Sequence, residues 1–229
     1  MKAEGNASGS HARNEGKGVV TDEMLVEVER EARRLLPPDD VHGVGHVERV
    51  LHLAREVWRA EGAGDPSSWN LLASMVWLHD VGRGREVGGE GHASASERLA
   101  QRLLKRLGWP ADLVDQVAGG VRRHSFSDRT FAGGTTSSFE ADALSDADKL
   151  DATGAIGLYR TCAHQATHGG RLGDVVDHLH EKLLSLGGLL RTRTAKAMAR
   201  DRLQFLRAWA EQLTRERTYS PKARNTSSK

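Results

Sequence analysis

The sequence predicts an all-α protein, built as a single compact helical bundle. Apolar residues recur at helical spacing through most of the chain, and no convincing run alternates between apolar and polar residues as a strand would. Its 229 residues suffice for one domain with its own core. We expect a disordered leader over 1–20, the helical domain over 21–217 and a disordered tail over 218–229, because both ends are polar and poor in apolar residues.

The first three helices are set by their start and stop signals. Thr21 is the expected N-cap of a first helix, which Pro37 and Pro38 stop near residue 36. A second helix is expected over about 45–61, and the glycines and proline of the following segment 62–66 end it. A third, over about 67–81, lacks a polar face, and this predicts burial on most of its sides.

The rest of the chain continues the helical pattern, interrupted by two irregular segments. A glycine-rich loop is expected over 82–91; no strand precedes it, so it does not match a phosphate-binding loop. The segment 125–138 is long enough to be a lid or a substrate-binding loop. Further helices are expected over 92–107, 110–124, 139–166, 174–185 and 190–217.

Composition excludes several classes of protein. Lys and Arg number 33 against 31 Asp and Glu, and this net charge of +2 gives no support to a nucleic-acid binder. Binding of nucleic acid through Arg83, Arg85, Arg122 and Arg123 is therefore the weakest hypothesis. The single cysteine, Cys162, excludes an intramolecular disulfide framework and fits a reducing compartment. With no membrane-spanning stretch and no secretory signal, we expect a cytoplasmic protein.

A histidine and an aspartate, His79 and Asp80, stand side by side at the end of the apolar run 71–78. Leaving both groups unpaired at the end of a buried helix costs free energy. A protonated His79 could cap the helix, but a carboxylate at that end opposes the helix dipole. A divalent metal would satisfy both groups, so the pair indicates a functional site.

Two other segments offer further ligands. Gly43 and Gly45 indicate that the second helix starts here, which places His46 near its N-terminus at a pocket wall; a pair of solvated or capping histidines, His42 and His46, is the alternative.

The acidic segment 146–151 contains three carboxylates beside apolar residues, and these repel one another unless one of them faces a cation. Asp148 and Asp151 share a helix face while Asp146 points away. A charged helix start capped by Ser145 or Asp146 is the alternative. Together with His46, His79 and Asp80, this segment can complete a set of two nitrogens and two oxygens for one divalent metal.

In this order along the chain, these residues resemble the HD superfamily of metal-dependent phosphohydrolases, and the chain is most similar to its small stand-alone bacterial members. The resemblance covers about residues 22–215. The segments that carry it are His42-Gly-Val-Gly-His46-Val-Glu-Arg49, Trp77-Leu-His79-Asp80-Val-Gly82, Val121-Arg-Arg-His124, Ser145-Asp-Ala-Asp148-Lys149-Leu-Asp151 and His178-Leu-His-Glu-Lys182.

The resemblance implies a role for each candidate residue. It implies that the metal ligands are His46, His79, Asp80 and Asp148, where the choice of Asp148 over Asp146 follows the family's Asp-Lys-Leu register. It implies catalytic roles for three residues that face the pocket or the metal: His92 and His124, of which one serves as general acid or orients the phosphate, and Asp151, which orients water. The residues implied to hold substrate are His42, Arg49, Lys149 and Lys182. The loop 83–91 departs from the family's loop before His92.

The implied chemistry is hydrolysis at phosphorus. The mixed nitrogen and oxygen ligands favour manganese as the one divalent metal, with Mg, Fe, Co, Ni and Zn as alternatives. A bound metal lowers the pKa of its water from about 15.7 towards about 7. The leading hypothesis is an enzyme that cleaves (deoxy)nucleoside triphosphates to monophosphate and pyrophosphate. A phosphomonoesterase or cyclic-nucleotide phosphodiesterase is the close alternative, and a non-catalytic nucleotide-sensing module is another.

The expected partner is a small-molecule phosphate ester, with neither nucleic acid nor a membrane involved. The choice between monomer and homodimer stays open.

Overall fold

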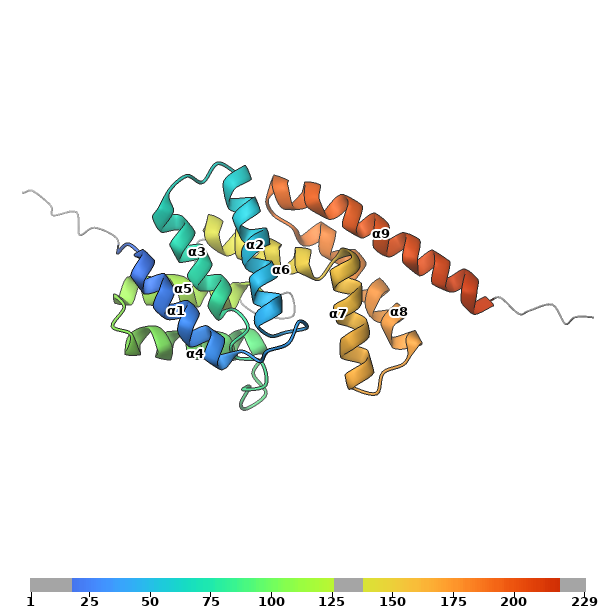
Figure 1. Ribbon diagram of the computed structural model, residues 1–229, viewed down its shortest axis with the longest axis horizontal. Helices are drawn as coiled ribbons and strands as arrows, with labels where there is room; N and C mark the ends of the chain where they lie inside the picture. The colour runs from blue at the N-terminus through green and yellow to red at the C-terminus, as the bar shows by residue number, and fades with distance from the viewer. Residues whose placement is uncertain (1–17, 126–137, 219–229) are drawn as a thin grey trace, which may run out of the picture.

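The computed structural model describes residues 18–125 and 138–218, and within these ranges every regular element is a helix (Figure 1). The all-α prediction is therefore confirmed. Most of the expected leader and tail, and most of the expected lid segment, lie outside the described residues. The packed chain begins earlier than the expected boundary at residue 21, because Val20 is 2% exposed within the core.

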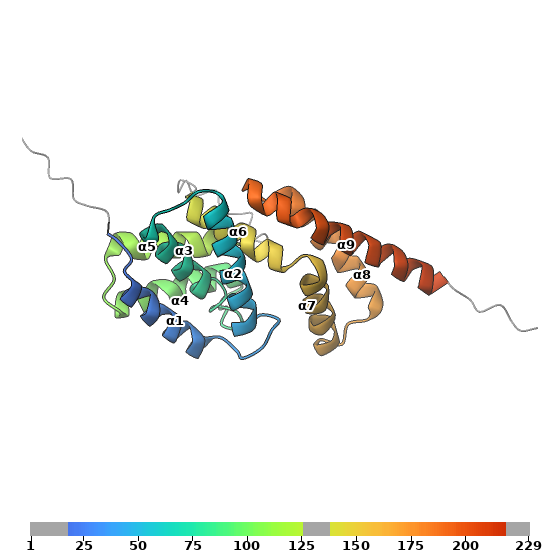
Figure 2. The same ribbon diagram turned by 45° about the horizontal axis from the view of Figure 1, so that its top comes forward.

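The first six helices pack side by side, and the last three extend beyond α6 and α2 (Figures 1 and 2). None of the described helices has the length and apolar character needed to cross a membrane. The helices are α1 (Asp22–Leu35), α2 (Val44–Ala60), α3 (Pro66–Leu78), α4 (His92–Arg106), α5 (Ala111–Arg123), α6 (Phe139–Asp151), α7 (Gly154–Thr167), α8 (Leu172–Glu181), the 3-10 helix η1 (Leu183–Leu189) and α9 (Arg193–Thr218).

Side chains at the helix starts explain several of these bounds. The Thr21 hydroxyl accepts a hydrogen bond from the Met24 amide, as expected, and Ser138 caps α6 in the same way. Asp65 caps α3, with Pro66 at the first helical position. Each cap satisfies an amide that has no partner within its own helix.

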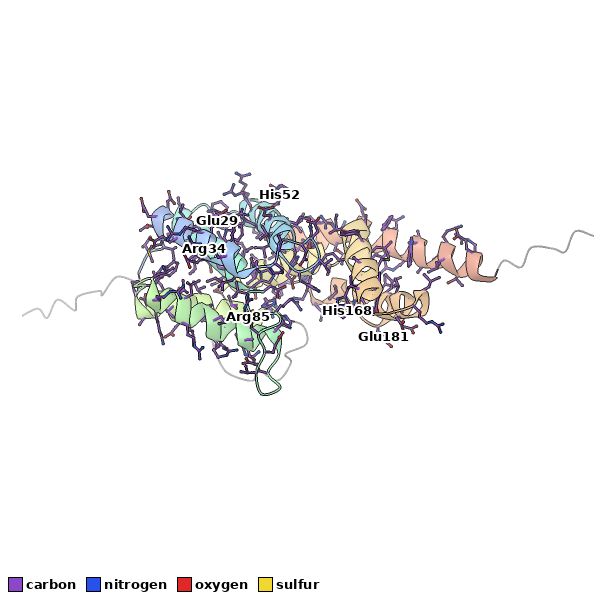
Figure 3. The ribbon with its side chains drawn as sticks, turned by 60° about the horizontal axis from the view of Figure 1, so that its bottom comes forward. Glu29, Arg34, His52, Arg85, His168 and Glu181 are labelled. Atoms are coloured by element: carbon purple, nitrogen blue, oxygen red, sulfur yellow. The ribbon has the colours of Figure 1, made fainter. Side chains whose placement is uncertain are left out.

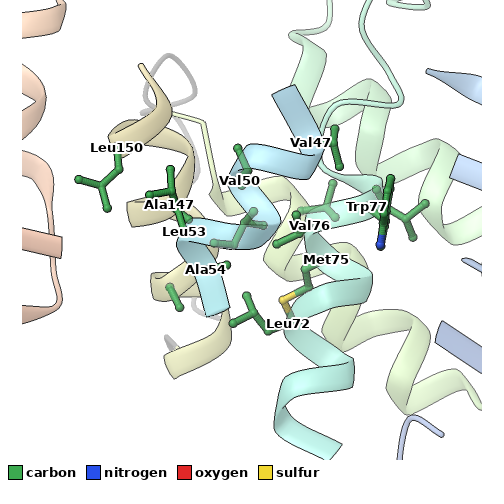
Figure 4. Close-up of a cluster of buried hydrophobic side chains, with 14 of the residues drawn as sticks. Val47, Val50, Leu53, Ala54, Leu72, Met75, Val76, Trp77, Ala147 and Leu150 are labelled. Atoms are coloured by element: carbon green, nitrogen blue, oxygen red, sulfur yellow. The ribbon is translucent and has the colours of Figure 1, made fainter. Parts of the chain in front are cut away.

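The core lies where α2 crosses α3 and α6 (Figure 4). Apolar side chains from the three helices interdigitate there, and those of α3 are buried along the whole of 72–78, as the sequence predicted. This packing fixes the ends of the three helices relative to one another. The labelled core residues include Val47, Val50, Leu72, Val76, Trp77 and Ala147.

The glycine-rich connection between α3 and α4 is packed against its surroundings at one end. A Cβ at Gly82 would lie 2.2 Å from the Ser96 amide nitrogen, so only glycine allows this close approach to α4. Arg85, labelled in Figure 3, then ties the connection to the bundle by donating to the carbonyl oxygens of Val81 (2.8 Å) and Leu35 (2.7 Å).

Three expected helices differ from the structure. The third helix ends at Leu78, so His79 and Asp80 lie in the turn that follows it. The helix expected over 139–166 is broken between α6 and α7, because Thr153 is extended and Gly154 has a φ of +69°. The helix expected over 174–185 is instead α8 followed by η1.

Candidate metal centre

Three helices bring the four predicted metal ligands together. His46 lies in the first turn of α2, His79 and Asp80 directly follow α3, and Asp148 lies on α6. From the His46 Nε2 atom, the distances are 3.2 Å to His79 Nε2, 3.5 Å to Asp148 Oδ1 and 3.7 Å to Asp80 Oδ2. The expected position of His46 near the N-terminus of its helix is confirmed, because α2 starts at Val44. Its imidazole is fully buried and is not among the residues that line the neighbouring cavity.

Hydrogen bonds fix the ring nitrogens that face this centre. His79 Nδ1 donates to the carbonyl oxygen of Val76 at 2.7 Å, and His46 Nδ1 donates to Asp151 Oδ2 at 2.8 Å. In the neutral rings both Nε2 atoms then carry lone pairs, and these face each other. Two lone pairs and two carboxylates in contact need a cation among them, so the residues fit a divalent metal.

A second group of ligand atoms lies on the other side of Asp80. Its Oδ1 atom is 3.7 Å from His124 Nε2 and 3.9 Å from His92 Nε2, so both predicted pocket histidines reach the centre. Among the described residues, this buried oxygen has no hydrogen-bond partner. Within residues 18–125 and 138–218, two groups have the spacing of metal ligands: His46, His79 and Asp148, and separately Asp80, His92 and His124.

Neighbouring charges set the protonation states at the centre. Burial raises the pKa of Asp80, but His79, Arg83 and His46 outweigh it and hold the net value far below the usual range. The pKa of Asp148 is likewise well below its usual range, since His46 and His79 outweigh burial. Burial, with His79 nearby, lowers the pKa of His124 to about 3. The centre therefore presents ionised carboxylates and a neutral His124 at neutral pH.

Acid is expected to destabilise the metal-free protein because buried histidines with a lowered pKa, such as His124, must take up protons when the protein unfolds. His124 titrates near 6.5 when unfolded and near 3 when folded, so between these values the unfolded state binds more protons. The free energy of unfolding then falls by about 1.4 kcal/mol per pH unit for each such histidine as the pH drops. The raised pKa of His46, where Asp148 and Asp151 outweigh burial, works in the opposite direction.

Urea unfolding of the EDTA-treated protein at pH 4 to 7 measures this slope. In the variant His124→Asn, the slope of the free energy of unfolding against pH is expected to be smaller by about 1.4 kcal/mol per pH unit, the contribution of one proton. An identical slope in the variant and the wild type would contradict a neutral His124.

A cavity of about 250 Å³ opens beside the centre. Three of the four residues expected to hold substrate line it: His42, Lys149 and Lys182. Arg49 does not. Its guanidinium group faces a separate groove, where it pairs with Asp151 and Asp40.

Lys149 is anchored within this wall. Its Nζ atom donates to the Ser145 carbonyl oxygen at 3.0 Å and the Ser145 hydroxyl at 2.5 Å, and it lies 3.5 Å from the His124 carbonyl oxygen. Burial lowers its pKa and that of Lys182. Lys149 therefore fixes the backbone beside His124 as well as lining the cavity.

The three aspartates of α6 have three different surroundings. Asp148 faces the centre, and Asp151 contacts His46 from the opposite side of the ring. Asp146 accepts from the backbone amides of Arg191 and Thr192 and from the Thr192 hydroxyl, and so holds the segment before α9. The alternative of a charged helix start at 145–146 is wrong, because α6 begins seven residues before Asp146 at Phe139.

Two arginines at the site were missed as site residues. Arg83 lines the cavity and donates from Nε to Asp80 Oδ2 at 2.6 Å, and Arg160 lines the cavity and binds Asp151. The spacing of three between Asp80 and Arg83 was a local signal for their ion pair. Nothing local connects Arg160 to the rest of the site.

Known proteins share this architecture. Residues 43–153 match the family described as HD domain. YpgQ of Bacillus subtilis (strain 168) is 29% identical over 179 residues, which cover 76% of this chain and 84% of YpgQ. Its crystal structure in complex with ADP aligns with a TM-score of 0.65 at 23% identity, covering 84% of this chain and 97% of that one.

Two further crystal structures are similar. A protein of Lactobacillus plantarum aligns with a TM-score of 0.72 at 29% identity, over 87% of this chain and 99% of its own. A protein of an uncultured Thermotogales bacterium, described as a predicted HD superfamily hydrolase, aligns with a TM-score of 0.57 at 26% identity, over 84% and 92% of the two chains.

Proposed function

Because this chain belongs to the HD superfamily and has the fold of its hydrolases, we propose that it is a metal-dependent phosphohydrolase that acts on nucleotides. The observation that carries the proposal is the convergence of two imidazole nitrogens and two carboxylates beside a cavity lined by cations. The ADP complex of YpgQ supports a nucleotide as the substrate. We propose that nucleoside triphosphates, including deoxy forms, are cleaved to monophosphate and pyrophosphate.

We propose that one divalent metal, preferably manganese, is held by His46, His79, Asp80 and Asp148. A divalent ion held there would lower the pKa of a coordinated water and would stabilise negative charge on the phosphoryl group. The ligands are preorganised for it, since the Val76 carbonyl and Asp151 hold the two imidazole rings in place.

The chain's own residues complete the proposed chemistry. His92 lines the cavity and is 18% exposed at its side chain, so we assign it a contact with the leaving phosphate oxygen. Burial lowers its pKa, so it makes this contact as a neutral imidazole that donates a hydrogen bond. His124 is fully buried with Nδ1 bonded to the Val121 carbonyl, which suits an orienting role. Lys182 and Arg83 add positive charge to the cavity, where phosphate oxygens are expected to bind.

A substrate panel with manganese, magnesium and nickel tests this proposal. Colorimetric phosphate detection is expected to give a signal from triphosphates only after pyrophosphatase is added. A signal without pyrophosphatase would favour the phosphomonoesterase alternative. Ring opening of a cyclic nucleotide, detected by mass, would favour the phosphodiesterase alternative. No release from any nucleotide, with metal confirmed bound, would contradict all three.

Lys182→Met is expected to raise KM for the triphosphate about tenfold to a hundredfold. A hydrogen bond to a charged group is worth about 1.5–3 kcal/mol, and this loss falls on binding. Steady-state kinetics measure the change, and Lys105→Met on the exposed surface of α4 is the matched control. An unchanged KM in Lys182→Met would remove Lys182 from the proposed substrate site.

A further inference from the structure

We propose that Arg160 is a positioning residue, which holds the metal ligand His46 through Asp151 rather than by binding phosphate. Arg160 lies on α7, seven residues beyond the segment that matches the HD domain. This inference rests on the proposed metal centre, and its kinetic part rests also on the proposed hydrolase function.

The guanidinium group of Arg160 is committed to protein partners. It is 8% exposed, and each of its three nitrogens has a partner in the fold. Nη1 donates to Asp151 Oδ2 at 2.9 Å, Nε donates to the Val41 carbonyl oxygen at 2.7 Å, and Nη2 donates to His42 Nδ1 at 3.3 Å. One side chain therefore joins α6, α7 and the connection before α2.

Asp151 is the point at which this arrangement reaches the metal centre. Its carboxylate is 1% exposed and receives the His46 Nδ1 proton donor at 2.8 Å, while Arg49 donates to it from Nε at 2.8 Å. A buried carboxylate that binds two guanidinium groups stays ionised and fixed in orientation. It then fixes the His46 ring with Nδ1 protonated and Nε2 towards the centre, as a carboxylate does behind a metal-bound histidine.

The two arginines on Asp151 differ in what else they hold. Arg49 belongs to α2, the helix that carries His46, and its other partner is the exposed Asp40. Arg160 comes from a different helix and also bonds His42, which lines the substrate cavity. Arg160 thus connects α7 both to Asp151, which holds the metal ligand His46, and to His42 in the cavity wall.

Arg160→Lys distinguishes positioning from phosphate binding. Lysine keeps the positive charge but cannot serve three partners in a plane. We expect a tenfold to hundredfold loss of Mn²⁺ affinity, measured by competition with a chelating dye without substrate, together with a lower kcat and a KM within twofold of the wild type. Lys182→Met is the matched contrast, with unchanged Mn²⁺ affinity and a raised KM.

Asp151→Asn provides an independent test of the same connection. It is expected to lose Mn²⁺ affinity similarly, and the double variant is expected to lose less than the product of the two single effects. Unchanged Mn²⁺ affinity in folded Arg160→Lys with a raised KM would overturn the proposal in favour of direct phosphate contact. If Arg160→Lys does not fold, unchanged Mn²⁺ affinity in Asp151→Asn would overturn it. If the wild type hydrolyses no nucleotide, the proposed function fails while the affinity measurements still decide the positioning role.

Discussion

Replacing Asp80 by asparagine is expected to abolish both metal binding and hydrolysis. The Asp80 carboxylate lies at the middle of the centre, with Oδ2 near His46 and His79 and Oδ1 near His92 and His124. Asparagine keeps the shape of the side chain and removes its charge, so the loss reports on the charge. We expect turnover to fall by more than about a hundredfold. This exceeds the loss of about tenfold to a hundredfold that follows when a residue hydrogen-bonded to a metal ligand is removed.

Metal content and turnover measure this effect together. Elemental analysis is expected to find one ion per chain in the wild type and none in Asp80→Asn. The exposed Asp177→Asn on α8 serves as the control, because it makes the same chemical change away from the centre. Normal metal content and turnover in Asp80→Asn would contradict the proposed centre.

Two other results would redirect the proposal. Two ions per wild-type chain would place Asp80, His92 and His124 around a second ion and would remove His92 from its proposed contact with the leaving oxygen. A wild type that binds metal and nucleotide without turnover, with nucleotide binding kept in Asp80→Ala, would support the sensing module.

Asp146→Ala is expected to lower stability without losing the metal, and Asp148→Ala is expected to lose the metal with a smaller change in stability. Removing the Asp146 carboxylate leaves the backbone amides of Arg191 and Thr192 and the Thr192 hydroxyl without their acceptor in these partly buried hydrogen bonds. We expect the free energy of unfolding to fall by about 2–4 kcal/mol with metal content unchanged, since hydrogen bonds to a charged group are worth about 1.5–3 kcal/mol each and do not add fully. Asp148→Ala is expected to lose the metal and to change metal-free stability less.

Urea unfolding of the EDTA-treated proteins, with metal analysis of the untreated ones, separates the two aspartates. Each variant is the control for the other, because they lie two residues apart on one helix. A stable Asp146→Ala protein without metal would show that the ligand had been assigned to the wrong aspartate.

Most helices could be predicted because their signals are local. Thr21 before α1, the glycines before α2 and Pro110 before α5 each mark a helix start within a few residues. The break between α6 and α7 was missed. A single glycine such as Gly154 does not by itself exclude a continuous helix, and its left-handed conformation is visible only in the structure. The short η1 after α8 was missed for a similar reason, because its leucines fit a helical pattern.

The candidate ligands were recognisable for a different reason. Polar groups that end a buried helix, as His79 and Asp80 do, have few other ways to be satisfied. His92 and His124 follow from the family resemblance, and the structure brings both to Asp80. Asp151 and Arg49 were predicted near the metal and the substrate, and the structure instead pairs them behind His46.

The sequence by itself determined the helical class, three residues of the centre (His46, His79 and Asp80) and the acidic segment 146–151 that supplies the fourth. The tertiary structure alone decided what each side chain contacts. Asp148 faces the centre while Asp146 holds the segment before α9. Arg160 reaches Val41, His42 and Asp151. The physical reason is the range of the interactions. Helix periodicity and capping act over a few residues. The hydrogen bond from Arg160 to Val41 spans 119 positions in the chain, and it forms only when α7 has packed beside the first six helices.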